Sequence, residues 1–98
     1  ETKTQKLINL IKQGDPIISL LEGIENNVGA VFGADTGYSE LEKGTIIAAK
    51  FSLADKYKGY IAVIGPNRMS YEKIIPATEY TAKRLTEIMT EAQKDMED

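Results

Sequence analysis

Side chains able to carry out chemistry are few in this chain, and they do not form a recognisable catalytic group. The sequence contains no cysteine and no histidine, which removes the thiolate nucleophile and the commonest general base and transition-metal ligand. A catalyst would have to use Asp, Glu, Ser, Tyr and Lys alone. The sequence shows no phosphate-binding glycine loop, nucleophile elbow or paired-carboxylate pattern. We therefore expect no enzymatic activity and no cofactor.

Acidic residues near the middle of the chain are candidates for a cation site. Asp35, Glu40 and Glu42 carry the carboxylate oxygens that calcium prefers, but they lack the regular ligand spacing of a calcium loop, so we predict no metal there. Asp35, Thr36 and Gly37 could instead line a small-molecule pocket. The alternative, which we favour, is a plain surface turn, because Asp and Gly are typical turn residues.

A second group of candidates surrounds a sharp turn. Gly65 and Pro66 end an apolar run, and Arg68 follows them just before a predicted helix. Backbone N–H groups and the guanidinium could hold an anion or a partner's carboxylate there. The alternative, which we favour, is that Arg68 pairs with an internal acidic residue and fixes the turn. Met69 is expected to fill a gap in the core, and Tyr71 to pack there with its hydroxyl hydrogen-bonded.

The elements that position these residues follow from the apolar pattern. It predicts two short helices (3–13 and 15–23), three strands (28–33, 45–53 and 59–64) and a long helix after Ser70. Residues 55–58 are predicted as a polar turn between the last two strands. The predicted fold class is α+β, a small antiparallel sheet with the helices packed on one face.

Capping and proline residues refine the helices. Asp15 and Ser70 are predicted as N-caps, and Pro76 is predicted to bend or split the last helix. That helix carries one apolar stripe at helical spacing, formed by Ile74, Thr78, Thr81, Leu85, Ile88 and Ala92.

Length and charge limit the possible functions further. The 98 residues suffice for one small domain or a domain fragment, and the first residue is Glu1, which suggests a piece of a longer protein. The net charge is −3, from 12 basic and 15 acidic residues, so no nucleic-acid surface is expected. No apolar run is long enough to span a membrane.

The segment 59–71 reads G-Y-I-A-V-I-G-P-N-R-M-S-Y. It strongly resembles the signature of the heat-inducible transcription repressor family of the HrcA type, which runs G-x-I-G-V-I-G-P-T-R-M-D-Y. Ala62, Asn67 and Ser70 stand where the family usually has Gly, Thr and Asp. The signature positions carried over by the resemblance are Gly59, Gly65, Pro66, Arg68, Met69 and Tyr71. Segments 45–51 and 76–89 resemble the family more weakly.

This resemblance implies a three-part repressor. An N-terminal winged helix would bind an operator upstream of chaperone genes, and a GAF-like domain would be interrupted by an inserted dimerising segment. Residues 1–98 would then be a single domain or the C-terminal half of the GAF-like regulatory domain. Such a protein is expected to be a cytoplasmic homodimer with a GroE-type chaperonin as partner, to contact DNA through the absent winged helix, and not to bind membranes. The alternative is a stand-alone GAF-like sensor of a small ligand, or an interaction module.

Overall fold

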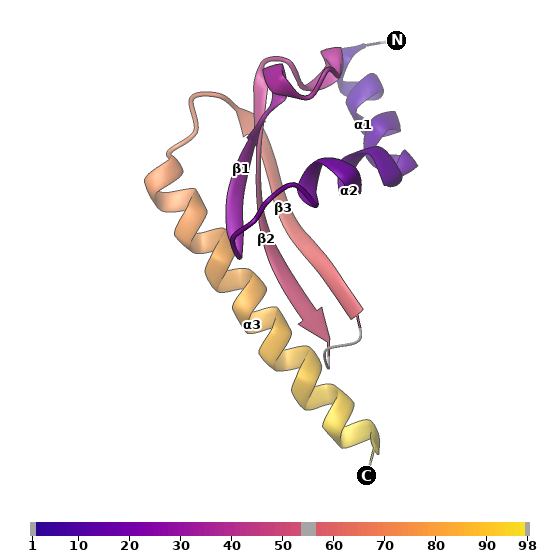
Figure 1. Cartoon of the computed structure of the whole chain (residues 1–98), viewed down its shortest axis with the longest axis vertical. Coiled ribbons are helices and arrows are strands. Elements are labelled where there is room, and N and C mark those ends of the chain that lie inside the picture. The colour runs from indigo at the N-terminus through magenta and orange to yellow at the C-terminus, as the bar shows by residue number, and fades with distance from the viewer. Residues whose placement is uncertain (1, 54–56, 98) are drawn as a thin grey trace.

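The computed structural model describes residues 2–53 and 57–97. Within them the elements follow the predicted order, with two additional short 3-10 helices (Figure 1). They are α1 (Lys3–Gln13), α2 (Asp15–Leu21), β1 (Val28–Phe32), η1 (Gly33–Asp35), η2 (Ser39–Leu41), β2 (Gly44–Leu53), β3 (Tyr57–Pro66) and α3 (Tyr71–Glu97). The predicted α+β class is confirmed.

The three strands form one antiparallel sheet in the order β1-β2-β3, with β2 in the centre. Thr45 of β2 pairs with Phe32 on one side and with Gly65 on the other. The predicted strand 59–64 is too short, because β3 keeps its pairing with β2 from Tyr57 to Pro66. Tyr57 and Lys58 therefore belong to the strand and not to the predicted polar turn, whose first two residues lie outside the described ones.

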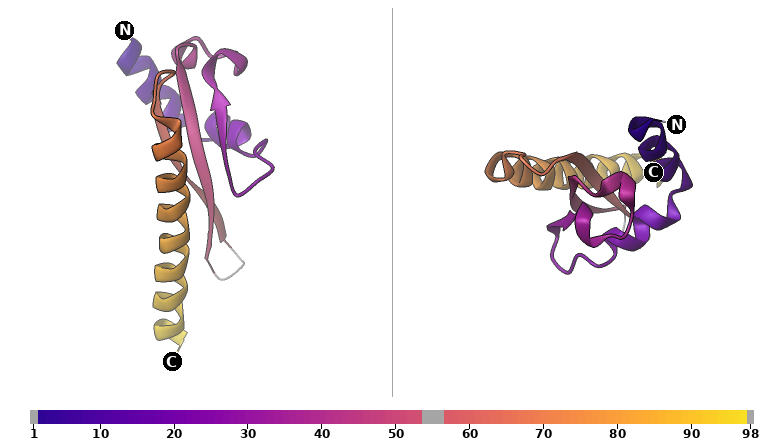
Figure 2. Two further views of the ribbon diagram at one scale, coloured as in Figure 1. Left: turned by 90° about the vertical axis from the view of Figure 1, so that its left-hand side faces the viewer. Right: turned by 90° about the horizontal axis from the view of Figure 1, so that it is seen from above.

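Helices cover both faces of the sheet, whereas the sequence pattern predicted one. Ile46 and Ala48 pack in a core with Leu10 of α1 and Leu21 of α2. The alternate positions of β2, Thr45, Ile47 and Ala49, are also almost completely buried. They lie on the opposite face, which α3 covers (Figure 2). A strand buried on both faces is apolar throughout and does not alternate.

Helix α3 is continuous through Pro76 and is not split there (Figure 2). Pro76 lies in the second turn, so its missing N–H removes one hydrogen bond near the helix start, and packing on the sheet maintains the rest. Thr78 and Ala82 are the buried residues of this helix. The predicted apolar stripe packs on the sheet in its first half, but Thr81, Ile88 and Ala92 are exposed.

Helix starts differ in detail from the prediction. Gly14 is the N-cap of α2, with a φ of 75° and no side-chain capping bond, so Asp15 is the first helical residue. Its carboxylate still lies in the first turn, where the helix dipole favours negative charge. Ser70 directly precedes α3, and its carbonyl accepts the N–H groups of Lys73 and Ile74, each at 3.0 Å. Among the described helices, none has the length and apolar character needed to span a membrane.

Candidate functional site

The residues of the signature segment gather at the end of the sheet where β2 begins and β3 ends. Pro66, the last residue of β3, pairs with Gly44, and Gly65 pairs with Thr45. The chain then turns within Asn67–Ser70 into α3. The Met69 N–H donates to the Pro66 carbonyl at 3.2 Å, which closes the turn. Strand, turn and helix start thus form one local unit.

A buried polar network fixes this unit to the central strand. The Thr45 hydroxyl, which has no solvent exposure, donates to Asn67 Oδ1 at 2.7 Å and lies 3.0 Å from the Tyr71 hydroxyl. The Tyr71 hydroxyl also donates to the Asn67 carbonyl at 2.7 Å. The predicted hydrogen-bonded role of Tyr71 is confirmed. Because buried polar groups are costly without partners, the network specifies this turn.

Two signature glycines make room for larger side chains. A Cβ at Gly65 would lie 2.7 Å from the Met69 sulfur, and one at Gly59 would lie 2.5 Å from the Phe51 ring. Met69 therefore packs against the backbone of β3, as expected of a gap-filling residue. Phe51, directly across the ladder from Gly59, covers that glycine in the same way. These glycines serve packing and not a ligand.

Arg68 differs from the other signature residues because it faces solvent. The favoured prediction, an ion pair with an internal acidic residue, is wrong for residues 2–53 and 57–97, where the ion pair formed is between Arg84 and Glu87. The guanidinium of Arg68 is therefore available at the surface, next to the turn and the start of α3.

The candidate pocket loop forms a self-contained turn at the same end of the sheet. The Thr36 hydroxyl donates to the Gly33 carbonyl at 2.7 Å and accepts the Tyr38 N–H at 3.1 Å. Gly37 has a φ of 81°, a conformation that glycine favours. Asp35 is exposed. These hydrogen bonds occupy the polar groups of Thr36 within the turn.

The acidic residues nearby do not form a metal centre. Among the described residues, no three potential ligands lie close enough to hold an ion. A hydrogen bond of 2.8 Å from the Ser39 hydroxyl to Glu40, together with a backbone hydrogen bond, lowers the pKa of the Glu40 carboxyl below its ordinary value. This carboxylate is engaged locally.

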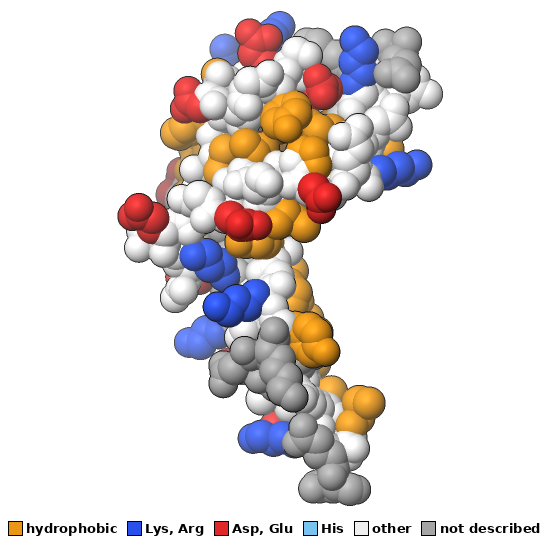
Figure 3. All heavy atoms as spheres, turned by 45° about the vertical axis from the view of Figure 1, so that its right-hand side comes forward, with side chains coloured by type: hydrophobic (Ala, Val, Ile, Leu, Met, Phe, Trp, Pro, Cys, Tyr) orange, Lys and Arg blue, Asp and Glu red, His pale blue; other side chains and the backbone are white. Residues whose placement is uncertain are grey.

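A groove of about 890 Å³ lies at the other end of the sheet, between α3 and the end of β2. Three lysines line it: Lys50, Lys58 and Lys83. Basic side chains gather beside the narrow waist of the molecule (Figure 3). The residues of the candidate loop, Asp35, Thr36 and Gly37, are not among those that line this groove.

Removing the Tyr71 hydroxyl tests the polar network. In Tyr71→Phe the Thr45 hydroxyl and the Asn67 carbonyl each lose a contact, and we expect a loss of about 1 to 2 kcal/mol in the free energy of unfolding. Urea denaturation followed by circular dichroism measures this. Tyr80→Phe is the matched control, because Tyr80 is 65% exposed on the same helix. An equal effect of both substitutions would contradict the role of the network.

The sequence was compared with known proteins. Residues 1–75 match the family model described as HrcA protein C terminal domain. The chain belongs to the HrcA family. It is 37% identical over 79 residues to the heat-inducible transcription repressor HrcA of Acholeplasma laidlawii, a match that covers 81% of this chain and 23% of that protein. The HrcA of Methylococcus capsulatus is 33% identical, with 79% and 23% covered.

Longer alignments to HrcA proteins extend through most of α3. The Syntrophobacter fumaroxidans HrcA is 29% identical over 96 residues, which cover 95% of this chain and 28% of that protein. The chain thus spans about a quarter of the length of these relatives. A crystal structure of a hypothetical protein superposes with a TM-score of 0.76 and 20% identity, covering 91% of this chain and 28% of that one. That likeness supports the fold alone.

Proposed function

We propose that this chain is the C-terminal regulatory part of a heat-inducible transcription repressor that lowers the transcription of chaperone genes. The observation that carries the proposal is the HrcA family match over residues 1–75, together with relatives named as heat-inducible transcription repressors. Residues 1–98 would be the C-terminal half of a GAF-like regulatory domain. The strand–turn–helix unit around Thr45, Asn67 and Tyr71 would give this half its rigidity.

Its contribution to repression is indirect. The net charge of −3 supports operator contact through another part of the repressor, the winged helix that the family resemblance implies. This part would act without enzymatic activity, in the cytoplasm, by holding a homodimer in the form that binds the operator. Heat would shift the population toward an inactive form.

A GroE-type chaperonin is the proposed partner that restores the active form. Three isoleucines on α1 and α2, Ile8, Ile11 and Ile18, are 44–47% exposed. Exposed apolar side chains of this kind support recognition by a chaperonin, which binds apolar surface. The marginal stability of a 98-residue unit also supports heat as the signal that inactivates it.

A chimera tests the proposal. The matched segment of the Acholeplasma laidlawii HrcA is replaced by this chain, and expression from that repressor's operator is measured with a reporter. We expect repression before heat shock and release after it. A chimera in which the same segment is deleted is the control and should not repress. Equal repression by both proteins would overturn the proposed role.

A further inference from the structure

One apolar surface of α3 is left uncovered by the chain itself. Thr81, Ile88, Ala92 and Met96 recur at intervals of three to seven residues and therefore lie on one side of the helix, with the half-buried Leu85 among them. Ile88 is 55% exposed and Met96 is 86% exposed. We call these five residues the α3 stripe. A helix that buried all its apolar surface in its own domain would not show it.

The sheet is too short to cover the stripe. The Thr86 hydroxyl accepts the N–H of Ser52 at 3.3 Å, and β2 ends at the next residue, Leu53. Helix α3 continues from Thr86 to Glu97, a further length of about 16 Å at the rise of an α-helix. Figure 1 shows its C-terminal part running on past the ends of the strands. This part needs a partner outside the domain.

We propose that the partner is the α3 helix of a second copy of this chain, packed antiparallel along the stripe. The charges beside the stripe are arranged for such a pair. Arg84 and Asp95 lie on the same flank, about three turns apart, and both are exposed. A two-fold axis near residue 90 places Arg84 of each copy beside Asp95 of the other, whereas a parallel pair would bring like charges together.

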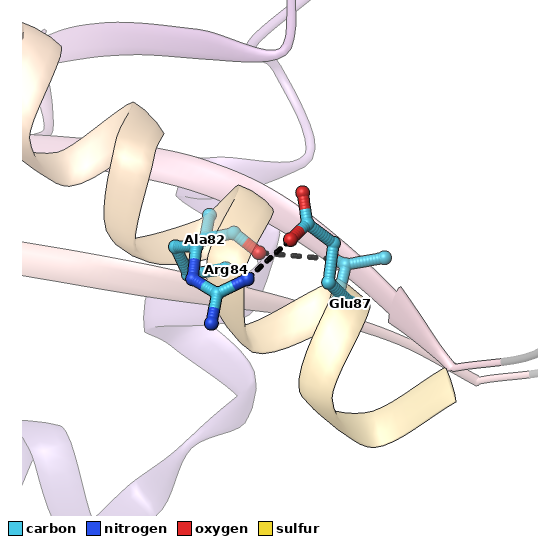
Figure 4. A network of polar contacts seen from close by, with 4 residues as sticks. Ala82, Arg84 and Glu87 are labelled. Atoms are coloured by element: carbon cyan, nitrogen blue, oxygen red, sulfur yellow. Dashed lines mark hydrogen bonds and ion pairs between the residues drawn. The ribbon is translucent and has the colours of Figure 1, made fainter. Parts of the chain in front are cut away.

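The apolar residues follow the same two-fold arrangement. In this register Ile88 lies against Ala92 of the second copy, and Leu85 lies against Met96. Within one chain Arg84 pairs with Glu87 (Figure 4), which holds its guanidinium on the outer side of the helix, where the second copy would approach. The inference deepens the dimer-supporting role proposed above and rests on it.

Cross-linking tests the antiparallel register directly. The chain has no cysteine, so Arg84→Cys and Asp95→Cys each introduce one thiol. A short bifunctional thiol reagent should join the two variants when they are mixed. It should not join either variant to itself, because equal positions are separated by about 16 to 18 Å along the axis in the antiparallel pair. Cross-linking of each variant with itself, or no cross-linking in the mixture, would overturn the proposal.

Sedimentation measures the energetic role of the stripe. The unaltered chain should approach twice its mass of 10.8 kDa with rising concentration, and Ile88→Asp should weaken this association at least about tenfold. Tyr80→Asp is the control, because Tyr80 is exposed outside the stripe and should leave it unchanged. The swap of Arg84→Asp with Asp95→Arg should restore the association that each single change weakens. Circular dichroism verifies that every variant is folded.

These outcomes separate the two proposals. If the chimera represses but no α3 pair forms, the stripe is covered by another segment of the repressor and the helix-pairing inference fails alone. If the α3 pair forms while the chimera does not repress, the proposed function fails and the pairing stands. An Ile88→Asp chain that self-associates like the unaltered one would overturn the inference without affecting the family assignment.

Discussion

Replacing Gly33 by alanine is expected to lower the free energy of unfolding by at least about 3 kcal/mol, enough to unfold much of the chain at 37 °C. A Cβ at this position would overlap the Leu41 carbonyl and lie 2.7 Å from the Gly44 oxygen. Both obstacles are backbone atoms, which cannot move aside as a flexible side chain would. The substitution would force η1, η2 and the start of β2 apart.

Gly23→Ala is the matched control for this prediction. A Cβ at Gly23 would meet the Leu20 carbonyl oxygen at 3.5 Å, an ordinary contact, so we expect a change within about 1 kcal/mol. Thermal unfolding followed by circular dichroism compares the two variants. A cooperative transition for Gly33→Ala at the temperature of the unaltered chain would show that the close approach of η1 and η2 is not required.

Truncating either central isoleucine of β2 is expected to cost about 3 kcal/mol. Ile46 and Ile47 both have no solvent exposure, but they face opposite sides of the sheet. Ile46→Ala leaves a cavity beneath α1 and α2, and Ile47→Ala leaves one beneath α3. Similar losses for both are the result expected of a sheet covered on two faces.

Urea denaturation gives the two free energies, with Val63→Ala as the control. Val63 is 36% exposed on β3 and should cost less than about 1 kcal/mol when truncated. A near-zero effect of Ile47→Ala, with a large effect of Ile46→Ala, would mean that α3 does not cover its face in solution.

The local order of the fold could be predicted from the sequence, because it depends on short-range patterns. Gly14 separates two helices, and Ser70 precedes the third. The coverage of the sheet could not be predicted by the same means, although the run Ile46–Ala49 carried the signal. Four consecutive apolar residues in a strand indicate burial on both faces, and the helices were nevertheless expected on one.

The candidate site was predicted in part. The residues from Gly65 to Tyr71 are contiguous in the sequence, and the structure places them in one turn. Thr45 was missed because it lies 22 residues from Asn67 and 26 from Tyr71. No local pattern links positions so far apart, and the pairing appears when β2 and β3 are in register. The α3 stripe was recognised, but its second half was assigned to the core because the sequence does not give the length of the sheet.

The most direct test of the account combines the chimeric HrcA repressor with the glycine pair. Reporter expression from the operator is measured before heat shock in cells that carry the Gly33→Ala chimera or the Gly23→Ala chimera. We predict loss of repression with Gly33→Ala and full repression with Gly23→Ala, because the folded C-terminal part holds the repressor in its active form. Full repression by a Gly33→Ala chimera, whose purified C-terminal part is unfolded, would contradict this claim.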